Sequence, residues 1–174
     1  MKHLILTLAL LGLVAGTALA AAKKPAAKAD LFDAKGNKVA TATLKEAKGG
    51  VQVSLQATGL PEGIHAFHIH AVGKCDAPDF KTAGGHFNPE HKKHGLQNPE
   101  GPHAGDMPNF TVGANGKGKT RYLDPRVTLG EGDNSLFHEG GTALVIHAKA
   151  DDNMSDPAGN AGDRIACGLI EKAQ

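Results

Sequence analysis

Seven metal-binding side chains in one pattern constrain this chain more than any other feature, because the fold must bring them together. A His-x-His pair comes first, a run with the spacing H-x7-H-x8-H-x2-D follows, and one histidine comes from much later in the chain. The side chains are His68, His70, His86, His94, His103, Asp106 and His147. Imidazole suits copper and zinc, and a carboxylate among histidines is common at zinc sites. The pattern therefore predicts a two-metal site with one shared ligand.

The phase of the first pair predicts a β-strand. Side chains alternate along residues 64–72, so that Phe67 and Ile69 face one side while His68 and His70 face the other. The apolar pair can fill a core, and both imidazoles can then converge on one ion outside it.

The same phase separates metal-binding histidines from the others. Leu144 and Ile146 are expected to face the core and His147 to face outward, again on a strand. His65 has the opposite phase from the His68 pair, so we interpret it as a structural hydrogen-bonding residue. Histidines outside the pattern are more often satisfied or exposed side chains than ligands. This interpretation covers His65, His91 and His138.

Short alternating segments separated by turn residues predict an all-β fold. The chain has 23 glycines and only 4% aromatic residues, and no segment has a convincing helical period. The expected strands are 30–34, 38–46, 51–58, 65–70, 109–112, 119–129, 142–147 and 164–170. Two long loops remain, 73–108 and 148–163, and long loops of this kind are usually functional. We predict an eight-stranded antiparallel Greek-key barrel or sandwich, immunoglobulin-like in architecture, with two long functional loops.

The N-terminus has the features of a secretory signal peptide. A short basic start precedes an apolar run from Leu4 to Ala15, and Ala18-Leu19-Ala20 supplies a small-x-small cleavage pattern. We expect a signal peptide at 1–20, a flexible Ala/Lys-rich tail at 21–29 and one domain at 30–174. The mature protein is then periplasmic or secreted, without a membrane span after cleavage. A formal net charge of +1 indicates neither a nucleic acid nor an anionic membrane as partner.

A phosphate-binding loop pattern occurs at 113–120, but we interpret it as a hairpin turn. The segment satisfies G-x-x-x-x-G-K-[ST], and that motif needs a helix after it. The residues that follow are strand-like and broken by Pro125.

Three segments resemble the copper/zinc superoxide dismutase family. Residues 63–70, GIHAFHIH, look like the copper-ligand strand of that family, and residues 84–89, GGHFNP, look like the segment around its metal-bridging histidine. Residues 159–168, GNAGDRIACG, resemble its active-site arginine and disulfide segment. The resemblance runs from about Asp30 to the C-terminus and is closest to bacterial secreted members.

The resemblance implies the ligands of each metal and the reaction. Copper would be held by His68, His70, His86 and His147. Zinc would be held by His86, His94, His103 and Asp106. His86 would bridge the two ions through its two ring nitrogens and take part in proton transfer. The implied reaction is dismutation of superoxide to dioxygen and hydrogen peroxide by copper that cycles between two oxidation states.

The resemblance also assigns residues around the metals. Arg164 would dock the superoxide anion beside copper. Asp151 resembles the carboxylate that links a copper histidine to a zinc histidine, and Asp152 is the less favoured candidate for that role. Such carboxylates orient the imidazoles that hold a metal.

The two cysteines, Cys75 and Cys167, are expected to form a disulfide. An even pair in an exported chain favours a bridge. The resemblance places this bridge between the loop after the copper strand and the final strand.

Two features of the family cannot be carried over. The loop after His147 is short and has little positive charge, so Lys74, Lys81, Lys92 and Lys93 could steer the substrate by position only. The loop around Cys75 lacks an insertion that some bacterial members carry, which leaves a homodimer open. Two other functions remain alternatives: a copper-binding or copper-delivering relative without turnover, and a secreted sandwich that metals only stabilise.

Overall fold

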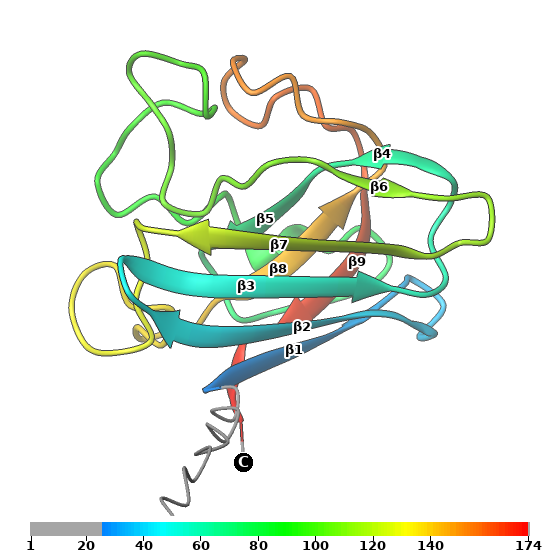
Figure 1. The fold of residues 1–174 in the computed structure, drawn as a ribbon, viewed down its shortest axis with the longest axis horizontal. Helices are drawn as coiled ribbons and strands as arrows, with labels where there is room; N and C mark the ends of the chain where they lie inside the picture. The colour runs from blue at the N-terminus through cyan, green and yellow to red at the C-terminus, as the bar shows by residue number, and fades with distance from the viewer. Residues whose placement is uncertain (1–25, 174) are drawn as a thin grey trace, which may run out of the picture.

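Ten strands form one antiparallel sheet in residues 26–173, the part of the chain that this computed structural model describes (Figure 1). They are β1 Ala27–Phe32, β2 Lys38–Ala47, β3 Gly50–Ala57, β4 Gly63–His65, β5 Phe67–His70, β6 Phe110–Val112, β7 Gly118–Asp124, β8 Ala143–His147, β9 Arg164–Leu169 and β10 Glu171–Lys172. Among these described residues, one 3₁₀ turn, η1, spans Lys81–Ala83.

The order of the strands makes the sheet a nearly closed barrel. Along the sheet they run β4-β6-β7-β3-β2-β1-β9-β8-β5, and β10 pairs with β1. The edge strands β4 and β5 are consecutive in the chain and only Ala66 separates them. The predicted all-β antiparallel fold is therefore confirmed.

Alternation along the strands fills the barrel with apolar side chains. In β3, Val51, Val53 and Leu55 are buried in the core cluster, whereas the residues between them are only partly buried. Phe67 and Ile69 of β5 enter the same cluster, as their phase predicted.

Strand β8 is buried on both faces. Leu144 and Ile146 belong to the core of the barrel. The other face carries a second apolar cluster, which contains Phe80, Ala83, Ala143, Val145 and Cys167. Because Phe80 and Ala83 come from the loop after β5, this cluster fixes that loop against the outside of the barrel.

The strand count differs from the predicted eight because one strand is interrupted and one is added. Ala66 breaks the expected strand 65–70: its N–H donates to Lys149 O at 2.9 Å, and its carbonyl accepts from His147 N at 2.9 Å. Strand β10 has only two residues, which pair with Ala27 and Lys28.

The expected flexible tail at 21–29 is wrong at its C-terminal end. Strand β1 begins at Ala27, and Ala27 and Ala29 are buried against β2. Residues 1–25 lie outside the described part of the chain, and with them the expected signal peptide at 1–20 and the start of the tail.

The expected strand 119–129 is also shorter in the structure. Strand β7 ends at Asp124, where Pro125 follows and the Asp124 carboxylate accepts the N–H of Arg126 at 3.0 Å. At its other end, a turn joins β6 to β7, with Gly113 N donating to Lys117 O at 3.0 Å. The phosphate-loop pattern is thus a hairpin turn, as predicted.

The two predicted long loops occur, and the outer part of the first rises at the top of the view in Figure 1, as the second does. They span 71–109 and 148–163, between β5 and β6 and between β8 and β9. Gln97 N donates to Asn153 O at 3.0 Å, and Asn98 Nδ2 donates to Met154 O at 3.1 Å. Within residues 26–173, no helix has the length and apolar character needed to cross a membrane.

Candidate metal centre

Strands β5 and β8 supply three of four histidines that meet at one point. His68 and His70 lie on β5 and His147 ends β8, its antiparallel neighbour. His86 joins them from the loop after β5 and forms a bridge pair with His70. We call this group the strand cluster, and its four ligand atoms lie within 4.8 Å of one another.

Each histidine of the strand cluster has one ring nitrogen bound and one free. The bound nitrogens contact Asp151, the carbonyls of Gly84 and Gly162, and Asp106 at 2.8–3.3 Å. The nitrogens without a protein partner are His68 Nδ1, His70 Nε2, His86 Nε2 and His147 Nε2, and all four are buried. Buried polar atoms are nearly always satisfied, so four unsatisfied nitrogens at one point indicate a site for an ion.

A second group, the loop cluster, lies entirely within the loop 71–109. It contains His86, His94, His103 and Asp106, again with ligand atoms within 4.8 Å. The Nδ1 atoms of the three histidines lie 2.9, 3.1 and 3.4 Å from Asp106 Oδ1. A tetrahedron of ligands at zinc bond lengths has edges of about 3.3 Å. The spacing of the loop cluster therefore matches a tetrahedral zinc site.

The Asp106 carboxylate is oriented by the main chain of its own loop. Its Oδ2 accepts hydrogen bonds from Gly95 N and His103 N, each at 2.9 Å. This leaves Oδ1 directed at the histidines.

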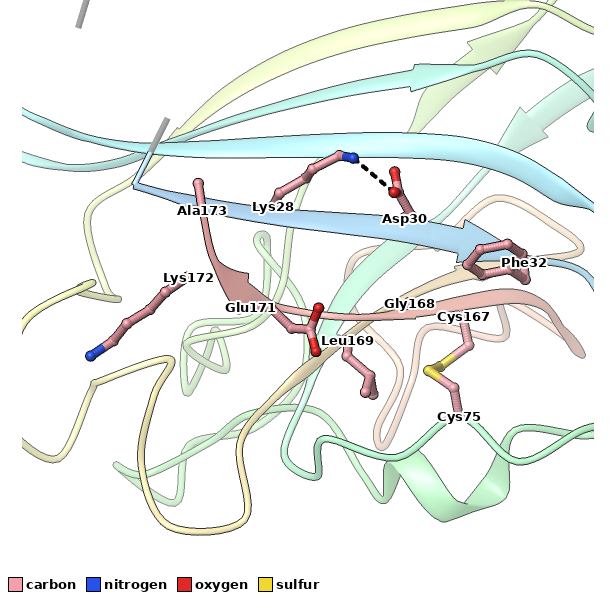
Figure 2. Close-up of a pocket in the computed structure, with 10 residues that line it drawn as sticks. All are labelled: Lys28, Asp30, Phe32, Cys75, Cys167, Gly168, Leu169, Glu171, Lys172 and Ala173. Atoms are coloured by element: carbon pink, nitrogen blue, oxygen red, sulfur yellow. Dashed lines mark hydrogen bonds and ion pairs between the residues drawn. A yellow bond between two sulfur atoms is a disulfide. The ribbon is translucent and has the colours of Figure 1, made fainter. Parts of the chain in front are cut away.

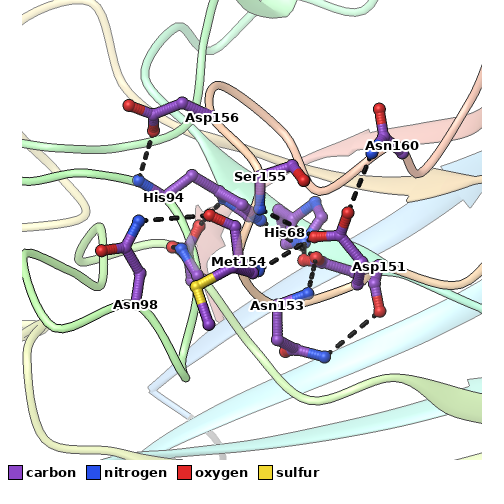
Figure 3. Close-up of polar contacts among 12 residues, drawn as sticks. His68, His94, Asn98, Asp151, Asn153, Met154, Ser155, Asp156 and Asn160 are labelled. Atoms are coloured by element: carbon purple, nitrogen blue, oxygen red, sulfur yellow. Dashed lines mark hydrogen bonds and ion pairs between the residues drawn. The ribbon is translucent and has the colours of Figure 1, made fainter.

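Asp151 links the two clusters (Figure 3). Its carboxylate lies 2.8 Å from His68 Nε2 and 3.0 Å from His94 Nε2, with the carboxylate buried. Asp152, the less favoured candidate, is exposed and accepts hydrogen bonds from Met154 and Ser155 of its own loop.

Side chains from outside the clusters hold Asp151 and His94 in place. The amide of Asn109 binds both main-chain groups of Asp151, at 2.8 Å each. The His94 N–H donates to Asp156 Oδ1 at 2.6 Å. Gly159 has a φ of 60° and packs against the Asp151 carboxylate, where a Cβ would overlap it. The loops 71–109 and 148–163 thus form one support for the centre.

His94 differs from the histidines of the strand cluster in its affinity for a proton. Burial lowers the pKa of His68 and of His147 to about 4 and that of His86 to about 3. Burial also lowers the pKa of His94, but the Asp106 and Asp151 carboxylates outweigh it and raise that pKa to about 9. Neutral imidazoles are the form that binds metals, so the strand cluster is prepared for an ion.

Arg164 lies beside the strand cluster and is held by main-chain carbonyls. Its Nη1 donates to Phe80 O at 2.8 Å and its Nη2 to Gly84 O at 2.7 Å. The guanidinium is half-buried in a surface depression that Pro78, Asp79 and Lys81 also line. Gly84 O also accepts from His70 Nδ1 at 2.9 Å, so one carbonyl connects the arginine to the strand cluster.

The predicted disulfide is present and ties the same loop to the barrel. Cys75 and Cys167 are bridged across 92 residues, with their Cα atoms 5.6 Å apart. Figure 2 shows the bridge beside Phe32 of β1 and Leu169 of β9, in a shallow groove on the outside of the barrel. Phe80 and Gly84, which hold Arg164, come a few residues after Cys75.

The other three histidines in residues 26–173 lie outside both clusters. His65 is buried, with ring nitrogens 2.8 and 3.0 Å from the carbonyl oxygens of His147 and Pro61, as expected for a structural residue. His91 is exposed. His138 stacks on Phe87 with ring centroids 5.3 Å apart.

Sequence reasoning missed three residues that contact the centre: Asn109, Asp156 and Arg126, whose Nη2 donates to Asp106 O at 2.6 Å. Asn109 comes three residues after Asp106, and only that short spacing could have drawn attention to it. Asp156 and Arg126 act across long sequence separations and carry no motif.

Comparison with known proteins identifies the family. The family model for copper/zinc superoxide dismutase matches residues 38–170. A copper/zinc superoxide dismutase of Aquifex aeolicus is 58% identical over 145 residues, which cover 82% of this chain and 86% of the relative. The crystal structure of a superoxide dismutase-like protein from Bacillus subtilis superposes with a TM-score of 0.79 at 39% identity, over 83% of this chain and 97% of that chain.

A further solved structure agrees. The copper/zinc superoxide dismutase of Brucella abortus has a TM-score of 0.65 at 29% identity, and the match covers 83% of this chain and 98% of that chain. With this barrel, these two clusters and these relatives, the chain belongs to the copper/zinc superoxide dismutase family.

Proposed function

We propose that this chain dismutates superoxide at a copper ion held by the strand cluster, beside a zinc ion held by the loop cluster. The copper ligands are His68, His70, His86 and His147, and the zinc ligands are His86, His94, His103 and Asp106. The observation that carries the proposal is that the two ring nitrogens of His86 belong to different clusters. Its Nδ1 lies 2.9 Å from Asp106 of the loop cluster, and its Nε2 is buried without a partner on the strand-cluster side.

The residues of both clusters fit the two metals. Four buried imidazole nitrogens suit copper, and three imidazoles with one carboxylate at tetrahedral spacing suit zinc. When bound, copper would supply one-electron redox chemistry, and zinc would supply a fixed positive charge.

The side chains of this chain supply the binding and proton steps. Arg164 binds the superoxide anion beside the strand cluster, where main-chain carbonyls fix its guanidinium. His86 gives up and regains a proton at Nε2 while Nδ1 stays with the loop cluster. In a full cycle, two superoxide anions and two protons yield one dioxygen and one hydrogen peroxide. Asp151 keeps His68 and His94 oriented toward their separate metals.

Export and assembly belong to the same proposal. A secretory signal at 1–20 would deliver the chain to the periplasm or the medium, where the Cys75–Cys167 bridge is stable. The N-terminal sequence of the secreted protein, expected to begin near Ala21, tests this assignment. Light scattering tests the homodimer.

His86→Ala tests the shared ligand, with His91→Asn as its control. Proton transfer by a placed side chain contributes about 10²–10⁴-fold to a rate, so superoxide decay should slow by at least about 100-fold. Copper spectra and zinc content should both change. Asn suits the φ of 55° at the exposed position 91, so the control should keep metals and activity.

The outcome also separates this function from its alternatives. A wild-type chain that binds one copper and one zinc without accelerating superoxide decay would be a copper-binding or metal-stabilised relative. Unchanged metals in His86→Ala would show that His86 is not the shared ligand.

A further inference from the structure

Arg126 is a nearly buried cation that the proposed reaction does not use. Its side chain is 16% exposed, and its partner Asp124 is fully buried. Neither residue belongs to a metal cluster. A buried ion pair stabilises a fold poorly compared with apolar packing, so its contacts need another explanation.

The guanidinium reaches the main chain of a loop-cluster residue. Arg126 Nη2 donates to the carbonyl oxygen of Asp106 at 2.6 Å, and also to Tyr122 Oη at 3.2 Å. Its Nε donates to Asp124 Oδ1 at 3.0 Å. The arginine thus joins the end of β7 to the residue whose carboxylate faces three histidines.

The backbone and Nε of Arg126 are themselves held in place by neighbouring residues. Asp124 Oδ1 accepts both the main-chain N–H and the Nε of Arg126, and Pro125 restricts the backbone between them. On the other side, Asn134 Nδ2 donates to the Arg126 carbonyl at 2.7 Å. Strand β7 pairs with β3 over its whole length, so the base of this contact is rigid.

Asp106 is therefore held at three points. Main-chain N–H groups of Gly95 and His103 hold its Oδ2, and Arg126 holds its carbonyl. The first two contacts come from the same loop and would move with it. The arginine contact links Asp106 itself to the barrel, beside the hydrogen bond from Ile69 N of β5 to the carbonyl of the neighbouring Gly105 at 3.0 Å.

We propose that Arg126 is a positioning residue for zinc: it fixes Asp106 relative to the barrel so that the loop cluster keeps its tetrahedral spacing before the ion binds. The inference rests on the proposed zinc site. Groups that orient a metal ligand typically change metal affinity by about 10–100-fold when they are replaced.

The test is zinc affinity, measured by chelator competition, in a variant that removes both charges. Replacing Arg126 alone would leave the buried Asp124 carboxylate unpaired and could unfold the chain. Arg126→Gln combined with Asp124→Asn avoids this. We expect zinc to bind about 10–100-fold more weakly in the double variant, with copper binding to the strand cluster retained.

Two single variants sharpen the test. Tyr122→Phe removes the other Nη2 contact and should leave zinc affinity unchanged. Arg126→Lys keeps the charge but cannot reach two acceptors with a planar fork, so its zinc affinity should fall between the wild type and the double variant. Cobalt(II) absorption reports the geometry of the loop cluster directly, and it should depart from the tetrahedral pattern only where zinc affinity falls.

The results distinguish three failures. A folded double variant that binds zinc as tightly as the wild type would overturn the role of Arg126. If the double variant bound zinc and copper equally more weakly and its metal-free form were also less thermally stable, Arg126 would have a general structural role. That result would overturn the positioning role as well. A wild-type chain that binds no zinc would overturn the proposed zinc site, and this inference with it.

Discussion

The strand cluster and the loop cluster share His86 but are built in different ways. Three members of the strand cluster lie on paired strands, and their ligand nitrogens have no partner in the protein. The members of the loop cluster lie within residues 86–106, which contain no strand. The ligand nitrogens of its three histidines all contact Asp106 Oδ1.

This difference teaches how each cluster is kept in shape. Strand pairing fixes His68, His70 and His147, so the strand cluster keeps its shape although its ligand nitrogens have no hydrogen-bond partner. In the loop cluster, the main chain of Ile69 on β5 binds the neighbouring residues Phe87 and Gly105 at 2.8 and 3.0 Å. The ligands themselves also depend on side-chain contacts with Asp151, Asp156 and Arg126. We therefore expect the loop cluster to be the more sensitive of the two to mutation.

The largest predicted effect is that of acid on the stability of the metal-free protein. His68 and His147 have folded pKa values of about 4, below the unfolded value near 6.5, so they stabilise the fold above pH 6.5. That contribution is lost as the pH falls toward 4, and we expect the free energy of unfolding to drop by on the order of 5 kcal/mol.

His94 should have the opposite pH dependence. Its folded pKa of about 9 means that its contribution is complete below pH 6.5 and is lost as the pH rises through 9. Urea unfolding of chelator-treated protein from pH 4 to 10 should give maximal stability near pH 6.5. Stability that stays constant from pH 6.5 to 4 would contradict the proton preference of the strand cluster.

Removal of the disulfide should have the next largest effect on the free energy of unfolding. Cys75→Ser with Cys167→Ser opens a closed segment of 92 residues, which the chain-entropy model values at about 4–5 kcal/mol. Because Phe80 and Gly84 hold Arg164 from this segment, activity should fall as well. Denaturant unfolding with and without reductant is the measurement. Reductant should destabilise the wild type and leave the double variant unchanged.

Asp151→Ala should affect metal binding at the two clusters to different extents. His68 keeps its position on β5, whereas His94 loses a contact that no strand replaces. Zinc affinity should fall by about 10–100-fold and copper affinity by clearly less. Asp152→Ala in the same loop is the matched control, because that carboxylate contacts only its own loop. Equal losses of both metals in Asp151→Ala would argue against the difference between the clusters.

Arg164→Glu should give the smallest of these effects that is still decisive. A negative charge where the anion binds should lower activity by more than tenfold, or about 1.4 kcal/mol of barrier, with both metals retained. Arg164→Lys should keep more activity because it preserves the charge. Pulse radiolysis across a salt series measures both. Full activity of copper-loaded Arg164→Glu would falsify the docking role.

How far the sequence predicts the structure also differs between the clusters. Alternation in residues 64–72 placed Phe67 and Ile69 in the core and His68 and His70 outside it, because strand periodicity is a local property. The interruption at Ala66 follows from contacts with Lys149 and His147, which local pattern does not contain.

The support of the loop cluster was beyond sequence reasoning for the same reason. Arg126 meets Asp106 only because β7 ends at Asp124 and turns the arginine toward the loop. The predicted strand continued to Leu129 and would have placed Arg126 within a ladder. Spacing predicted which side chains gather, but not what holds them there.

The carbonyl of Gly84 has a consequence for how such a site can change over evolution. It accepts hydrogen bonds from both Arg164 and His70. A carbonyl belongs to the backbone, so no substitution at residue 84 can remove this acceptor while keeping the chain. Mutations that shift the loop are therefore expected to alter the proposed anion site and a proposed copper ligand together, so that selection on one property also acts on the other.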